Sequence, residues 1–152
     1  MPEAHQPAAV RPALSLQPPN FAAKDPGIGG WRHLFDQARG ADAAGIDRLV
    51  VSDHVVLGEQ LGNYADPKKG GIKGGVQPTG PDGQWLDPIV VLSMWAAVTK
   101  RTRFLTGILI APLRRPATLA KQLSTLDTLS AKTANIRDMH AHRISSLLSK
   151  CS

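Results

Sequence analysis

Apolar residues follow two alternating patterns along this chain. Short apolar runs, typical of strands buried on both faces, predict strands near residues 13–16, 48–52 and 103–110. The segments 31–44 and 116–130 instead repeat apolar residues every three or four positions, as helices with one buried face do, and the largely apolar segment 88–100 is also predicted to be a helix. This alternation of strand and helix predicts an α/β fold built from parallel βαβ units.

Residues at the segment boundaries support these elements. Gly45 stands just past the first helix, where a left-handed residue commonly ends the helix. Asp87 can accept the free amides of the second helix, and Pro88 and Pro116 suit first helical positions. Gly107 inside the third apolar run indicates a bulge or the close approach of a ligand.

The segment 55–84 is different in kind. It contains GNYADPKKGGIKGGVQPTGPDGQ, which is rich in glycine and proline and has no stable period. We therefore predict a long, structureless and mobile loop that serves as a lid over the strand ends. Its GGIKGG piece could form an anion-binding nest of backbone amides, although simple flexibility is the favoured alternative.

Chemically capable side chains follow the second predicted strand directly. Ser52, Asp53 and His54 come after the apolar run that ends at Val51. Ligands gather where the carboxyl ends of parallel strands open into loops, so this carboxylate and imidazole could orient a cofactor or move a proton. The alternative is that Asp53 caps a turn and His54 is merely exposed.

Composition narrows the class of protein. The content of 42% apolar and 20% charged residues is that of a globular domain, and no apolar run approaches the roughly 20 residues of a membrane span. No signal-like pattern opens the sequence, so we expect a cytoplasmic protein without a membrane partner. Cys151 is the single cysteine, which excludes an internal disulfide and a CxxC metal site.

The net charge of +6 raises the question of nucleic acid. However, the basic residues lie in short clusters such as Lys100-Arg101 and Arg114-Arg115, which we interpret as solvated surface. The hypothesis of a nucleic-acid partner rests on charge alone and is therefore disfavoured.

Two segments carry a family resemblance. WRHLFDQARGADAAGIDRLVVSDHVVLGE and DPIVVLSMWAAVTKRTRFLTGILIAPLRRPATLAKQLSTLDTLS resemble the start of the luciferase-like monooxygenase superfamily. The second is the more specific, because strand, loop, proline-started helix and closing LDTLS arrive in order. That superfamily includes flavin-dependent monooxygenases and oxidoreductases that use the deazaflavin coenzyme F-420.

The resemblance implies a fold and a site. Members are (β/α)₈ barrels with the cofactor ring at the C-terminal face, so this chain would hold the first three βα units of a truncated TIM barrel. Asp53 and His54 would lie beside the ring of FMN or F-420, with His54 binding it or transferring a proton. Gly107, Ile108 and Leu109 would support the ring, at a position where relatives have a bulge and sometimes a non-proline cis peptide.

The sequence departs from the family after Ala131. We expect a tail at 1–12, a partial barrel domain at 13–131 and a divergent helical tail at 132–152. A frameshift, a premature stop and a natural short form all remain open as origins of that last segment. Its apolar residues are spaced as in an amphipathic helix: Ile136, Met139, Ile144, Leu147 and Leu148. His140 and His142 are read as surface residues rather than a metal site.

Two functions remain beside the nucleic-acid reading. The first is a flavin- or F-420-dependent oxidoreductase that performs hydride or oxygen chemistry on a small organic substrate. The second is a non-catalytic fragment that binds a protein partner or associates with itself through open sheet edges. Because the later barrel loops that hold the cofactor phosphate are missing, we expect the isolated chain to bind FMN or F-420 weakly or not at all.

Overall fold

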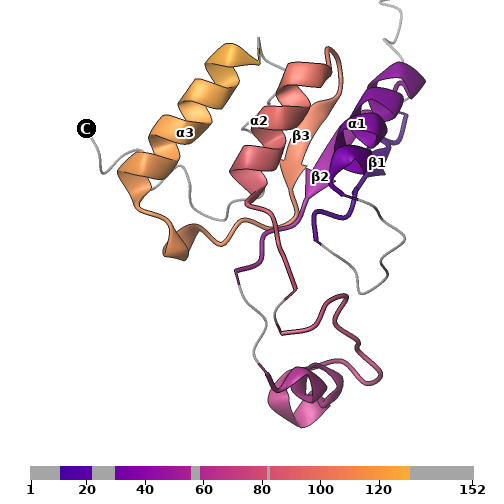
Figure 1. Cartoon of the computed structure of the whole chain (residues 1–152), viewed down its shortest axis with the longest axis vertical. Helices are drawn as coiled ribbons and strands as arrows, with labels where there is room; N and C mark the ends of the chain where they lie inside the picture. Colours follow the sequence, from indigo (N-terminus) through magenta and orange to yellow (C-terminus); the bar gives the residue numbers. More distant parts are fainter. Residues whose placement is uncertain (1–10, 22–29, 56–58, 82, 131–152) are drawn as a thin grey trace, which may run out of the picture.

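A computed structural model describes residues 11–21, 30–55, 59–81 and 83–130. Three strands alternate with three α-helices, as the apolar pattern predicts (Figure 1). In chain order the elements are β1 (Ser15–Leu16), α1 (Arg32–Ala44), β2 (Arg48–Val51), the 3₁₀ helices η1 (Leu61–Ala65) and η2 (Pro67–Lys69), α2 (Pro88–Val98), β3 (Arg103–Thr106), the 3₁₀ helix η3 (Ala111–Leu113) and α3 (Pro116–Leu129).

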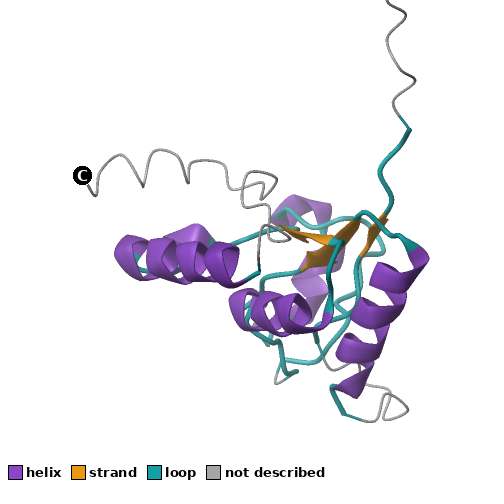
Figure 2. Ribbon diagram, turned by 90° about the horizontal axis from the view of Figure 1, so that it is seen from above, coloured by secondary structure: helices purple, strands orange, loops and turns teal. Residues whose placement is uncertain are grey.

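The strands form one parallel sheet in the order β1-β2-β3. Leu49 of β2 is paired with Phe104 of β3, and Val51 with Thr106. The three α-helices lie on the same side of this sheet (Figure 2). The expected parallel βαβ arrangement is confirmed, and all strand ends therefore open at one edge, called here the carboxyl edge.

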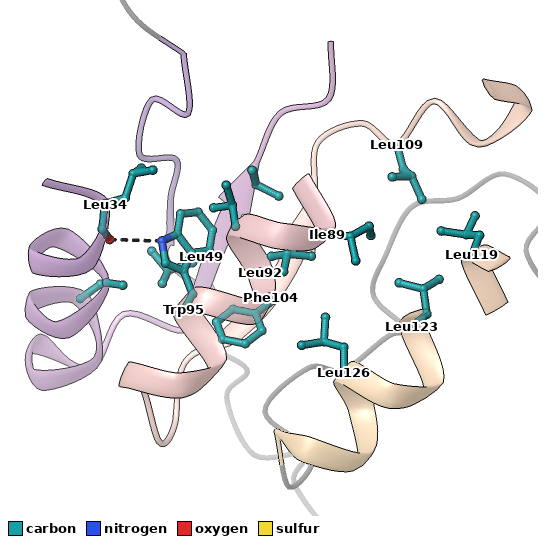
Figure 3. Packing of buried hydrophobic residues seen from close by; sticks show 14 residues of the cluster. Leu34, Leu49, Ile89, Leu92, Trp95, Phe104, Leu109, Leu119, Leu123 and Leu126 are labelled. Carbon is teal, nitrogen blue, oxygen red and sulfur yellow. Dashed lines mark hydrogen bonds between the residues drawn. The ribbon is translucent and has the colours of Figure 1, made fainter. Parts of the chain in front are cut away.

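The core fills the space between the sheet and the helices. Leu49, Val51 and Phe104 face α2, whose Trp95 is fully buried among them. The indole Nε1 of Trp95 donates a hydrogen bond of 3.1 Å to the carbonyl oxygen of Leu34 on α1 (Figure 3). This bond compensates the desolvation cost of a polar atom in an apolar layer, and it ties α1 to α2.

The helix ends follow the local sequence. Gly45 has a φ of 75° and ends α1 in the left-handed region that glycine adopts without strain. The Asp87 carboxylate accepts hydrogen bonds from the amides of Ile89 and Val90, and Pro88 occupies the first turn of α2. These capping predictions are confirmed.

The two largest differences from the prediction concern the third strand and the segment 55–84. The third strand ends at Thr106 instead of reaching residue 110, because Gly107 makes the last ladder bond, to the carbonyl oxygen of Val51, and the chain then turns into η3. The segment 55–84 is also not structureless, since η1 and η2 form within it around a capping Asp66. The amphipathic segment 132–152 lies outside the described residues.

Candidate functional site at the carboxyl edge

Segments far apart in the sequence meet at the carboxyl edge. Ser52 to His54 leave β2, Gly107 to Leu109 leave β3, and Asp87 begins α2. The segment with η1 and η2 extends from this same edge, away from the helices (Figure 1). The edge therefore collects the residues that the sequence singled out, as the topology of parallel strands requires.

Asp53 is buried and fully engaged. Its side chain is 2% exposed, and its two carboxylate oxygens accept hydrogen bonds from the Arg114 guanidinium at 2.5 and 3.2 Å. One of these oxygens also accepts the backbone amide of Ile110 at 2.7 Å. Asp53 thus fixes the segment after β3 to the end of β2, which is a supporting rather than an open position.

Arg114 connects three segments and was missed by the sequence analysis. Besides Asp53, its guanidinium donates to the Asp87 carboxylate at 2.9 Å and to the carbonyl oxygen of Ile110 at 3.3 Å. Burial alone would lower the pKa of Arg114, but the hydrogen bonds to Asp53 and Asp87 raise it above its usual value. The reading of Arg114-Arg115 as solvated surface is therefore wrong for Arg114, whose side chain is 16% exposed. The available signal was its place between a buried strand and a helix that starts with proline.

His54 lies half-buried against an aromatic side chain. Its ring centroid is 4.8 Å from that of Trp85, and Trp85 in turn lies 4.5 Å from Phe21. The Trp85 indole donates a 3.2 Å hydrogen bond to Thr79. Within the described residues the His54 imidazole has no hydrogen-bond partner, so its ring nitrogens remain available to a ligand.

Asn20 joins the segments that follow β1 and β2 to the start of α2. It is fully buried, and its side-chain amide donates to the carbonyl oxygens of Ser52 at 2.8 Å and Leu86 at 3.1 Å. Its Oδ1 has no partner among the described residues. Nothing in the sequence distinguished this asparagine from an ordinary turn residue, because its partners are distant along the chain.

The three residues predicted after β3 have different environments. The peptide bond between Gly107 and Ile108 is cis, at the position that the family resemblance indicates. Ile108 is 63% exposed, whereas the Leu109 side chain is buried in the hydrophobic core. A Cβ on Gly107 would lie 2.9 Å from Cγ1 of Val50, so the close approach at this glycine is by a neighbouring strand.

The GGIKGG piece does not present a free nest of amides. The amides of Gly70, Gly71, Ile72 and Gly75 donate to carbonyl oxygens of Pro67, Asp66, Tyr64 and Ile72, in that order. A Cβ on Gly71 would lie 2.4 Å from the Tyr64 carbonyl oxygen, which explains the glycine there. The predicted anion-binding nest is therefore wrong for these four amides, which close turns, while Gly71 and Gly75 permit close packing against the Tyr64 carbonyl oxygen.

Among the described residues, no three His, Cys, Asp or Glu side chains gather as metal ligands would. None of the helices in that part of the chain is long and apolar enough to cross a membrane. His140 and His142 lie outside it.

Comparison with known proteins identifies the family. The family model described as Luciferase-like monooxygenase matches residues 11–131. No curated protein matches the chain.

Solved structures share the fold. The oxygenating constituent of 3,6-diketocamphane monooxygenase from Pseudomonas putida, solved in complex with FMN, has a TM-score of 0.54 at 18% identity, over 80% of this chain and 28% of that one. Monooxygenase RslO1 from Streptomyces bottropensis has a TM-score of 0.52 at 21% identity, over 80% of this chain and 30% of that one. Apo-MsnO8 has a TM-score of 0.54 at 18% identity, over 90% of this chain and 36% of that one. The chain therefore spans about a third of the length of these structural relatives.

Proposed function

Because the chain belongs to the luciferase-like monooxygenase family, we propose that its carboxyl edge is the ring side of a flavin site in an oxidoreductase for small organic substrates. The observation that carries this proposal is the meeting of two segments. The one after β2 bears Asp53 and His54, the one after β3 bears the Gly107–Ile108 peptide, and the Asp53 carboxylate joins them through the Ile110 amide.

The residues at this edge suit a flat ring with polar margins. Ile108 offers an exposed apolar side chain, and the Trp85 ring backs the half-buried His54 imidazole. His54 would bind the polar margin of the ring or hold a proton there, while Asp53 and Arg114 keep the two segments in register. A bound flavin would itself supply the hydride or oxygen chemistry.

The same residues offer less to a cofactor phosphate. Three of the four glycine amides of GGIKGG already close turns. Charge-assisted hydrogen bonds contribute about 1.5–3 kcal/mol each, so losing three of them weakens binding by roughly a thousandfold or more. We therefore expect the 152-residue chain to bind FMN weakly or not at all, and the same holds for F-420, the alternative cofactor.

Titration of the purified chain with FMN and with F-420, followed by cofactor fluorescence, tests this expectation. A fusion to the remaining βα units of the diketocamphane monooxygenase constituent should bind FMN, and His54→Ala should then weaken binding or slow turnover. His54 forms only a ring contact within the described residues, so the thermal midpoint of the His54→Ala fusion serves as the folding control.

The outcomes separate the two parts of the proposal. A folded fusion that binds neither cofactor contradicts the flavin site. Micromolar binding by the 152-residue chain alone, abolished by His54→Ala, supports the site and shows that three βα units hold the cofactor without the later loops.

Self-association is the second candidate function. Within the described residues β1 and β3 have no neighbour on their outer sides, and Val90 of α2 and Leu129 of α3 are 59% and 79% exposed. Open edges and exposed apolar residues favour association with another chain. Sedimentation velocity across a range of concentrations tests this: a monomer throughout rules it out.

A further inference from the structure

A surface groove runs between α2 and α3, which pack beside each other and both begin at the carboxyl edge (Figure 1). Its volume is about 470 Å³. The buried side chains of Ile89 and Leu126 form its floor. None of the side chains assigned to the flavin site lines this groove, so what binds here does not depend on the function proposed for that site.

The α2 wall of the groove is more apolar than a helix surface in contact with water usually is. α2 has no charged residue among its 11 positions. Val90, Ser93 and Ala97 of this wall are nevertheless exposed, and the exposed fraction of Val90 is 59%. A helix that is apolar nearly all round is normally covered on all sides. The α2 wall therefore indicates that a further element packs against it.

The α3 wall favours an apolar occupant over a charged one. Lys121 is the one charged residue among the described walls, where it lies beside Gln122 and Thr125. Leu129, at the end of α3, is 79% exposed. A strongly charged partner would lose hydration in this groove and find a single ion pair, whereas apolar side chains gain by leaving water.

The chain itself supplies an occupant in the right place. α3 ends at Leu129, on the groove wall, and the sequence continues directly into 131–152, which lies outside the described residues. Two antiparallel helices need a connection of about 2–5 residues, which 131–135 provide. As a helix, 136–148 would span about 20 Å, close to the roughly 21 Å of the 14-residue α3.

The sequence of 136–148 suits this place. Asn135 is a favoured N-cap residue, and Asp138 and Ser145 fall on one side of the resulting helix. His140 and Arg143 fall within the opposite, apolar side, where such side chains can extend their polar ends to water. The apolar residues of that side are Ile136, Met139, Ile144, Leu147 and Leu148.

We propose that residues 136–148 fold back as a helix antiparallel to α3 and dock their apolar side in the groove between α2 and α3. A short connection holds this segment near the groove at an effective concentration in the millimolar range. The segment should therefore occupy the groove in preference to a second copy of the chain, which would need the same exposed Val90 and Leu129.

The single cysteine of the chain provides the test, because an antiparallel segment brings Cys151 from the end of α3 back toward its beginning. A nitroxide attached to Cys151 should broaden the amide resonances of Val90 and Lys121 more strongly than those of α1. A mixture of isotope-labelled Cys151→Ser chain with unlabelled, nitroxide-bearing chain reports contacts between molecules. We expect no broadening at the groove in that mixture.

Two variants on opposite sides of the segment sharpen the test. Ile144→Glu places a charge on the docked side, so it should abolish the broadening and accelerate amide exchange in 136–148 by about tenfold or more. Ser145→Glu adds the same charge to the other side and is the matched control, which should change neither. Val90→Glu, on the exposed groove wall, should act as Ile144→Glu does. If Val90→Glu does not fold, Leu129→Glu takes its place with the same expected loss.

Three results overturn the proposal. The first is the absence of broadening at the groove in the nitroxide-bearing wild-type sequence. The second is broadening that also arises in the mixture, which assigns the groove to a second copy of the chain. The third is an equal effect of Ser145→Glu and Ile144→Glu, which shows that the apolar side of the segment does not bind the groove.

Discussion

The two edges of this sheet are held together in different ways. At the edge where the strands begin, called here the amino edge, acidic side chains accept backbone amides: Asp42 binds the turn before β3, and Asp47 binds Leu14 just before β1. At the carboxyl edge, the half-buried Arg114 joins the side chains of Asp53, which is buried, and Asp87. The first kind of contact joins a side chain to backbone amides, and the second joins both ends of the β2–α2 connection to the connection after β3.

The difference has a physical consequence. A partly exposed carboxylate that accepts amides can be hydrated when a contact is lost, so each contact contributes modestly. A buried ion pair leaves an uncompensated charge when one partner is removed, so its loss is costly. The amino edge should therefore tolerate substitution, whereas the carboxyl edge should depend on Arg114.

The largest effect is expected at Arg114. Arg114→Ala leaves the Asp53 carboxylate, which is 2% exposed, without its cation, and should lower the free energy of unfolding by about 3–5 kcal/mol. Urea unfolding followed by circular dichroism measures this loss. Arg115→Ala, at an exposed neighbour without a side-chain cap bond, is the matched control and should change the stability by less than about 0.5 kcal/mol. Equal losses in the two variants would remove the contrast between the edges.

A smaller effect is expected at Asp42. Burial alone would raise its pKa, but the amides of Thr102, Arg101 and Lys100 lower it below the ordinary value of 3.8. Asp42→Asn should lower the free energy of unfolding at pH 7 by about 1–2 kcal/mol, because bonds to a charged acceptor are replaced by weaker ones.

The pH dependence of that effect follows from the direction of the pKa shift. A carboxyl group whose pKa is depressed by folding contributes stability above its unfolded pKa and loses it as the pH falls through the folded pKa. The difference between wild type and Asp42→Asn should therefore be full at pH 7 and shrink as the pH falls below about 4. Urea midpoints at several pH values check this. A difference that does not change with pH would show that the stabilisation does not depend on the charge of Asp42.

The smallest effect on global stability is expected in the segment with η1 and η2. Gly71→Ala places a Cβ 2.4 Å from the Tyr64 carbonyl oxygen, so the local turns must open. Amide exchange in 59–81 should accelerate while the free energy of unfolding changes by less than about 1 kcal/mol. Gly62→Ala, where a Cβ meets nothing within 4 Å, is the control. Exchange in wild type as slow there as in β3 would contradict the expected mobility of this segment.

Local sequence determined the elements and several of their ends. The signals that act within a few residues are the spacing of apolar residues and the helix-end residues Gly45, Asp87-Pro88 and Pro116. The strands, helices and caps follow these signals. The excess length predicted for the third strand has the same origin. The apolar run continues to Ile110, but Leu109 belongs to the helix-covered core and Ile108 to the surface, which a one-dimensional pattern does not separate.

In the candidate site, too, local sequence determined one part and tertiary contacts determined the other. The sequence by itself identified Asp53 and His54, because parallel topology places the residues after a buried strand at the carboxyl edge. Only the tertiary structure decided what they contact: the Asp53 carboxylate binds Arg114, and the His54 ring lies against Trp85. The local sequence did not show what Arg114 and Asn20 bind, since apart from Ile110 their partners lie 27 to 66 positions away in the chain. Contacts at that separation form only once the sheet and its helices have brought the segments together, and a pattern of near neighbours does not contain them.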